Sequence, residues 1–133
     1  MTVRKQLGFT LVEVITVVLI IGVLAAIAYP SYVGMMQRSR RAEAATIINE
    51  QSLRLEKFRV DNASYGDYWD APQGVTETDF YTVDGEGDAD GYTVVATPKN
   101  GPQKNDPCGA LTLTYAAGTT ERSAEAGGAE DCW

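Results

Sequence analysis

The sequence predicts an α+β fold: a long, bent N-terminal helix, half of it transmembrane, packed on a small antiparallel β-sheet head with one C-terminal disulfide. Three observations predict this fold. Residues 9–29 are almost entirely apolar, and residues 38–60 are helix-forming with one apolar stripe. The remainder consists of short runs rich in Thr, Val and Tyr, broken by Gly, Pro and Asp. A chain of 133 residues has room for one such domain.

Composition argues against enzyme chemistry. The chain has no histidine and only two cysteines, which excludes His-based triads, imidazole-ligated metals and four-thiolate clusters. It has no nucleophile elbow, phosphate loop or dinucleotide fingerprint. The formal charge of −7 disfavours nucleic acid as a partner, because an acidic surface repels phosphates. We therefore expect a non-catalytic protein without a cofactor.

The apolar stretch from Phe9 to Tyr29 has the length of a membrane span. At a rise of 1.5 Å per residue it forms about 31 Å of helix, against a hydrocarbon core of about 30 Å. A buried core helix is the first alternative, but the head is too small to cover it on all sides. A removed secretory signal peptide is the second, because small residues occur near its far end. Arg4 and Lys5 precede the stretch, so the positive-inside rule predicts a cytoplasmic N-terminus and a periplasmic head.

Glu13 is the only charge within this stretch. An acid inside hydrocarbon is costly, so a partner should be sought for it. One interpretation places Glu13 close enough to the headgroups to reach them. The other gives it a cation on another molecule. A chain cut between Gly8 and Phe9 would supply that cation, because the new amine of Phe9 lies four residues away on the same helix face.

The segment Gly8-Phe9-Thr10-Leu11-Val12-Glu13, behind a short basic leader and before a long apolar run, resembles the class III signal of type IV prepilins. The resemblance implies cleavage after Gly8 by the prepilin peptidase, N-methylation of Phe9, and a role for Glu13 in subunit assembly. It implies residence in membrane lipid at the inner membrane, handling by the pilus assembly machinery there, and then packing against other pilin subunits in an extracellular fibre.

Pro30 should kink the helix, and Gly22 is a second position at which the helix could bend. Alternatively, Pro30 could end the helix. The absence of Gly and Pro from Arg38 to Val60 favours continuation. The resemblance implies that helicity is lost between Gly22 and Pro30 in assembled pili. The apolar stripe predicted to face the head is Ala44, Ile48, Leu55 and Phe58. The basic cluster Arg38-Ser39-Arg40-Arg41 should meet anionic lipid or a neighbouring subunit.

The head should be an antiparallel meander joined to the helix by a loop at 61–77, whose aromatic residues pack locally. The strands are predicted at 78–83, 91–97, 110–115 and, more weakly, 119–123. Cys108 and Cys132 are the only cysteines, and their disulfide should stabilise the head by about 3–4 kcal/mol. The segments around these cysteines resemble type IVa pilin-like proteins, particularly minor pilins of the PilE type.

The acidic run at 84–91 is a weak calcium candidate through Asp84, Glu86, Asp88 and Asp90. It does not fit an EF-hand loop, and we prefer an exposed acidic turn between two strands, with no metal. The expected parts are a cleaved leader, a transmembrane assembly helix, an amphipathic half of the same helix and a head: residues 1–8, 9–30, 31–60 and 61–133.

The sequence thus predicts a structural pilin-like subunit of a type IV pilus, acting in pilus assembly, twitching motility and adhesion, and belonging to the minor class. The alternatives are a type II secretion pseudopilin, which the C-terminal disulfide disfavours, and a pilus-associated adhesin or DNA-uptake minor pilin, which the acidic head disfavours. A membrane-anchored enzyme lacks the necessary chemistry.

Overall fold

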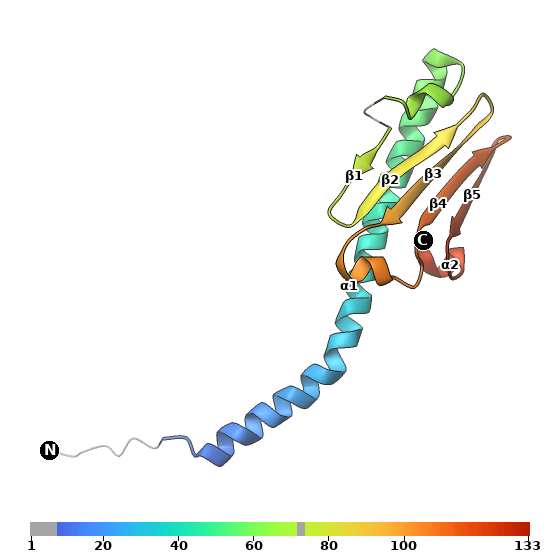
Figure 1. Cartoon of the computed structure of the whole chain (residues 1–133). Helices are drawn as coiled ribbons and strands as arrows, with labels where there is room; N and C mark the ends of the chain where they lie inside the picture. Colours follow the sequence, from blue (N-terminus) through green and yellow to red (C-terminus); the bar gives the residue numbers. More distant parts are fainter. Residues whose placement is uncertain (1–7, 72–73) are drawn as a thin grey trace. The chain divides into compact units, whose positions relative to one another are not determined.

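The structure is a computed structural model that describes residues 8–71 and 74–133. The chain forms two compact units, one ending at Met35 and one running from Met36 to Trp133, which are described separately. The elements in chain order (Figure 1) are α1 (Leu11–Asn62), η1 (Gly66–Tyr68), β1 (Thr76–Glu77), β2 (Tyr81–Gly87), β3 (Gly91–Pro98), η2 (Gly101–Asn105), β4 (Leu111–Ala116), β5 (Thr119–Ala124) and α2 (Ala129–Cys132).

Helix α1 continues through Pro30 to Asn62, so the alternative that Pro30 ends the helix is wrong. The prediction of one helix over both halves is confirmed. Beyond Pro30 the chain is rich in strong helix formers, which favours continuation. The helix ends where Ala63 adopts a left-handed φ of 54° and donates its backbone N–H to the carbonyl of Arg59. The predicted loss of helicity between Gly22 and Pro30 concerns assembled pili and stays a prediction.

The five strands form one antiparallel sheet in the order β1-β2-β3-β4-β5, which confirms the predicted meander. The predicted bounds of β3, β4 and β5 hold to within one residue, and the larger differences concern β2 and β1. The first expected strand, 78–83, begins only at Tyr81, because the Thr78 hydroxyl accepts the backbone N–H groups of Phe80 and Tyr81 and closes a turn. The short strand β1, within the expected loop 61–77, was not predicted.

The acidic run was expected to be a turn throughout, and this was wrong for residues 84–87. These residues belong to β2 and pair with Tyr92 to Val95 of β3. Only the segment between β2 and β3 turns. There the Asp88 carboxylate accepts the backbone N–H groups of Asp90 and Gly91, both at 2.8 Å. Paired strand hydrogen bonds thus override the turn preference of Asp and Gly in the first half of the run.

In the unit from Met36 onward, α1 lies against one face of the sheet (Figure 1). Ala44, Ile48 and Leu55 are buried, as predicted, and Phe58 is half-buried against the core. Their buried partners on the sheet are Tyr81, Val83, Tyr92, Val94, Ala96, Leu111 and Leu113. Strand residues between them face the other side, because side chains alternate along a strand.

One polar side chain, Gln51, is buried within the same helix stripe. Its amide donates to the hydroxyl of Thr76 at 2.6 Å, and its carbonyl oxygen accepts from the Tyr68 hydroxyl at 2.5 Å. These bonds compensate for removing the amide from water. Gln51 thereby ties α1 to both β1 and η1.

An aromatic cluster closes the end of the core beyond η1. Tyr65 and Tyr68 are buried, which confirms that the aromatic residues of the 61–77 segment pack locally. The ring of Tyr65 lies 4.9 Å from that of Tyr92, and Tyr92 stacks on Tyr115 at 5.2 Å. The pKa of Tyr92 is raised to about 12, chiefly by burial and also by the nearby Glu56 carboxylate, against the lowering effect of the Ser52 hydroxyl bonded at 2.6 Å.

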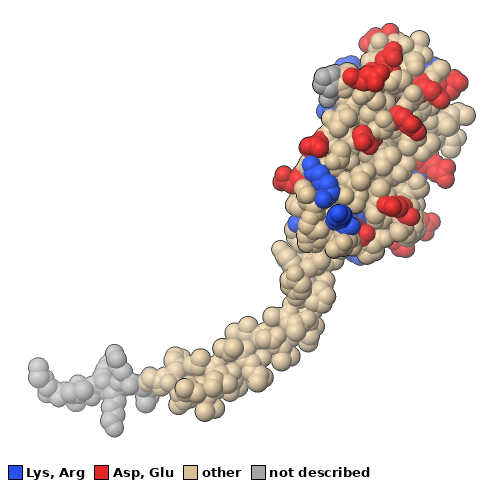
Figure 2. All heavy atoms as spheres, in the orientation of Figure 1, with Lys and Arg blue, Asp and Glu red and all other residues tan. Residues whose placement is uncertain are grey.

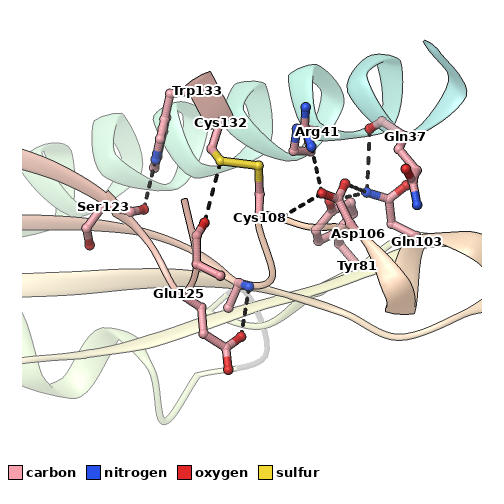
Figure 3. Close-up of a disulfide and its surroundings, with 12 residues drawn as sticks. Gln37, Arg41, Tyr81, Gln103, Asp106, Cys108, Ser123, Glu125, Cys132 and Trp133 are labelled. Atoms are coloured by element: carbon pink, nitrogen blue, oxygen red, sulfur yellow. Dashed lines mark hydrogen bonds and ion pairs between the residues drawn. A yellow bond between two sulfur atoms is a disulfide. The ribbon is translucent and has the colours of Figure 1, made fainter. Parts of the chain in front are cut away.

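The opposite end of the head is held by a disulfide and a buried ion pair (Figure 3). Cys108 and Cys132 are bonded, as predicted. Two residues before Cys108, the Asp106 carboxylate has no exposed surface and lies 2.6 Å from the Arg41 guanidinium of α1. It also accepts the Cys108 backbone N–H at 2.9 Å and the Gln103 amide at 2.5 Å. These donors compensate for removing the Asp106 carboxylate from water.

The contacts of the basic cluster at residues 38–41 differ from those predicted. Arg41 is committed to Asp106, and the Arg40 guanidinium lies 3.7 Å from the centre of the Phe80 ring. Both side chains therefore face the head rather than lipid or a neighbour. Arg38 is exposed.

We expect Tyr92→Phe to lose less of its free energy of unfolding than wild type when the pH is raised. The neutral phenol is favoured in the folded chain, so its contribution is complete below the ordinary pKa of 10.0 and is lost as pH rises toward about 12. Urea unfolding of the full chain in detergent, at about pH 8 and about pH 11, should show a smaller loss for Tyr92→Phe than for wild type. The exposed Tyr32→Phe is the control and should match wild type. An equal loss in Tyr92→Phe would contradict the assignment.

We expect Asp106→Asn to destabilise the head by about 3–5 kcal/mol, because it leaves the Arg41 guanidinium without a counter-charge. A double-mutant cycle with Arg41→Met, measured by urea unfolding, should show strong coupling between the two sites. The control is Glu77→Gln, which removes a surface partner of Lys99 at 3.7 Å and should cost at most about 1 kcal/mol. Additive effects of the two buried substitutions would contradict the ion pair.

Candidate assembly site

The candidate site lies at the start of α1, where the backbone is capped by a side chain. Gly8, Phe9 and Thr10 precede the helix, and the Thr10 hydroxyl accepts the backbone N–H of Glu13 at 3.3 Å. Thr10 is therefore an N-cap and Glu13 stands three residues beyond it, the spacing of a capping box. A carboxylate in the first turn is also favoured by the helix dipole. The sequence analysis missed this cap, although the Thr-x-x-Glu pattern could have indicated it.

Phe9 and Glu13 share one surface. Together with Val14, Val17 and Val18 they line a hollow of about 280 Å³. Phe9 is 84% exposed among the residues that the structure describes. Among residues 8–71 and 74–133, Glu13 forms no ion pair. The hollow thus joins an uncompensated carboxylate, an open aromatic ring and an apolar wall.

The rest of the segment is an exposed apolar rod. Its most apolar window has a mean hydropathy of 2.8 and none of it is buried, so by length and composition α1 can cross a membrane. The Thr16 hydroxyl donates to the Val12 carbonyl at 2.8 Å, which satisfies it within the helix. The visible face of this segment carries no charged atoms (Figure 2).

The remaining predicted residues of this segment fall into two groups. Gly22 and Pro30 lie inside α1, and a side chain added at Gly22 would meet nothing within 4 Å. The leader cations Arg4 and Lys5 lie outside the described residues.

The four weak calcium candidates do not converge. Asp84 and Glu86 lie two residues apart on β2 and are exposed. The Asp88 carboxylate is occupied by the backbone N–H groups of Asp90 and Gly91, which lower its pKa below the usual range. Within the described part of the chain, no group of three or more His, Cys, Asp or Glu residues could hold a metal ion.

Comparison with protein families matches both halves of the chain. Residues 3–29 match the family described as "Prokaryotic N-terminal methylation motif". Residues 30–112 match the family described as "Type IV minor pilin ComP, DNA uptake sequence receptor".

Individual relatives agree with this assignment. A "Fimbrial protein" of Dichelobacter nodosus is 32% identical over 120 residues, which are 87% of this chain and 71% of that protein. The "Type IV major pilin protein PilA" of Myxococcus xanthus is 39% identical over 48% of this chain and 29% of its own. The "Type II secretion system core protein G" of Vibrio cholerae is 39% identical over 47% of this chain and 42% of its own. No solved structure matches. The methylation motif, the minor pilin family matched over residues 30–112 and the fimbrial relative matched over 87% of the chain show that the chain belongs to the type IV pilin family.

Proposed function

We propose that the chain is a minor subunit of a type IV pilus. The subunit would reside in the inner membrane before assembly and would then pack into the fibre through α1. The observation that carries this proposal is the exposed apolar segment with Glu13 at its start. Residues 11–29 are all exposed in the described part of the chain, and so long an apolar surface would lie against lipid or other helices. The minor class is supported by the description of the family matched over residues 30–112.

Processing and topology follow from the start of the chain. The prepilin peptidase would cut after Gly8, and the new terminus at Phe9 would be methylated, as the motif matched over residues 3–29 supports. Arg4 and Lys5 favour a cytoplasmic leader, which directs the head to the periplasm. The disulfide between Cys108 and Cys132 suits that oxidising compartment. No enzyme activity is proposed, and the relatives are named as fimbrial proteins, pilins and a secretion-system core protein.

Glu13 would direct assembly through its charge. A negative charge suits the N-terminal end of the dipole of α1, yet the apolar surface beside Glu13 penalises a charge without a partner. The methylated amine of Phe9 on an adjacent subunit would neutralise it, because cleavage after Gly8 would create a cation at the same end of the apolar segment. Only a subunit at the matching axial position would bring its amine next to Glu13. The pair would therefore set the register between neighbouring subunits.

We expect Glu13→Gln to be inserted and processed but to reach sheared fibres at least about tenfold less than wild type, the size of a lost contact of about 1.4 kcal/mol. The amide keeps the side-chain volume and loses the charge. Mass spectrometry of the membrane-bound chain should show a mature terminus at methylated Phe9 in both variants. Quantitative immunoblots of sheared fibres measure incorporation.

The matched control is Glu43→Gln, which removes an exposed acid of the same helix away from the hollow and should leave incorporation unchanged. Wild-type levels of Glu13→Gln in fibres would rule out the charge-based register. A wild-type chain that keeps residues 1–8, or is missing from fibres, would refute the function itself.

DNA capture is the second candidate, because the family matched over residues 30–112 is described as a DNA uptake sequence receptor. The charge of this head is unfavourable for it. Residues 61–133 carry fourteen acids and three cations. Of those cations, Lys99 lies 3.7 Å from Glu77 and Arg122 lies over the ring of Trp133. Figure 2 shows acidic atoms spread over the visible face of the head.

We expect the full chain in detergent to bind duplex DNA weakly and without sequence preference. This binding should disappear at physiological salt. Arg54 and Lys57, which border a hollow with Phe58 and Tyr68, are the cations best placed for phosphate. Fluorescence anisotropy with labelled duplexes would measure this, with Arg54→Glu as a probe of the hollow. Sequence-specific binding in the range of about 10⁻⁸ to 10⁻¹¹ M would overturn this expectation and favour the receptor.

A further inference from the structure

A hollow of about 340 Å³ lies at the end of α1 and contains two cations, although the head is acidic. We call it the helix-end hollow, and its lining residues are Arg54, Lys57, Phe58, Asp61, Asn62 and Tyr68. The first five belong to α1, where spacings of three and four residues bring side chains to one side of the helix. Tyr68, from η1, completes the lining. The volume lies at the lower end of the range of small-molecule sites.

Arg54 and Lys57 have no acidic partner that would account for them. Both residues are exposed, and the ion pairs found among residues 8–71 and 74–133 involve neither of them. The dipole of α1 favours cations in its last turn, where Arg59 lies, and this effect does not reach the preceding turns. Neighbouring like charges on a helix repel each other. An anion bound by Arg54 and Lys57 would relieve this repulsion, so the helix-end hollow favours a negatively charged group.

Aromatic surface borders the same cations. Phe58 is half-buried and meets the ring of Tyr68 edge to face, with 5.5 Å between the ring centres. Tyr68 is only 2% exposed, so the accessible aromatic surface is that of Phe58. Burial raises the pKa of Tyr68 and the nearby Arg54 guanidinium lowers it, which agrees with a guanidinium beside the aromatic pair. One ligand can therefore meet a positive charge and an aromatic ring together.

The remaining lining residues can accept hydrogen bonds from hydroxyl groups. Asp61 is exposed, and its carboxylate is an acceptor. Asn62 donates an amide N–H to the carbonyl of Phe58 at 2.9 Å, which orders its side chain, and its amide oxygen is a second acceptor. Asp61 also brings a negative charge into the hollow, which disfavours a polyanion such as nucleic acid. The lining therefore suits a ligand with one negative charge and several hydroxyl groups.

We propose that the helix-end hollow binds one acidic sugar residue, a pyranose that carries a carboxylate. The carboxylate would lie against Arg54 and Lys57, because charge-assisted hydrogen bonds to a carboxylate are among the strongest. The hydroxyl groups would donate to Asp61 and Asn62, and the C–H groups of the sugar ring would lie on the electron-rich face of Phe58. The inference goes beyond the proposed function and does not depend on it, since every lining residue belongs to the unit from Met36 to Trp133.

The first test measures sugar binding to the full chain in detergent, by titration with saturation-transfer NMR. The probes are D-glucuronate and N-acetylneuraminate. At least one should bind with a Kd of about 1 mM or lower, and at least about tenfold more tightly than glucose, which lacks the carboxylate, or acetate, which lacks the ring. Equally tight binding of acetate or inorganic phosphate would indicate an unselective anion site and overturn the proposal. Failure of both acidic sugars to bind would overturn it as well.

The second test is the double variant Arg54→Gln with Lys57→Gln. Because both residues are exposed and outside the ion pairs of the described chain, thermal unfolding should be unchanged, while affinity for the acidic sugar should fall at least about tenfold. The matched control is Arg38→Gln, which removes an exposed cation of the same helix outside the hollow and should bind like wild type.

Two outcomes of this second test would overturn the proposal. One is unchanged affinity in the double variant, or an equal loss in the Arg38→Gln control, because either result would place the sugar elsewhere. The other is binding of duplex DNA that the double variant loses, without binding of either sugar, because the helix-end hollow would then be a nucleic-acid site.

Discussion

The structure depends on a single helix that must suit two different surroundings. Residues 11–29 of α1 are apolar except for a few positions such as Glu13, and they are exposed in the described part of the chain, whereas residues 44–55 present a narrow stripe to a protein core. A helix can serve both because it satisfies its own backbone hydrogen bonds wherever it lies. The side chains alone then decide the surroundings, and Pro30 does not interrupt this arrangement because the helix continues through it.

Two carboxylates show how the chain divides its contacts between itself and its neighbours. Asp106 is fully buried and finds Arg41, Gln103 and a backbone N–H within the head. Glu13 has a helix cap close by and, among the described residues, no cation. The same side-chain chemistry therefore stabilises the fold at Asp106, whereas at Glu13 we propose that it favours association. A charge left uncompensated beside apolar surface is the clearest sign that a neighbouring molecule completes the site.

Much of the fold could be predicted from the sequence because its signals are local and strong. The length of the apolar segment, the helix-forming stretch to residue 60 and the alternating strands are periodic patterns, and a single pair of cysteines leaves one disulfide. The errors arose where side chains or pairing override propensity. Thr78 closes a turn inside a run rich in strand formers, and residues 84–87 extend β2 despite two glycines.

The sequence by itself determined the class of protein, the helix and the presence of an unmatched acid at Glu13. Only the tertiary structure decided which part of the protein, or solvent, each side chain contacts. Arg40 and Arg41 form one basic run with Arg38, yet the fold turns them toward Phe80 and Asp106, which lie 40 and 65 positions farther along the chain. Leu53 and Leu55 are nearly adjacent, yet one faces water and the other the core. Periodicity assigns residues to a face, but contacts between distant segments decide what that face touches.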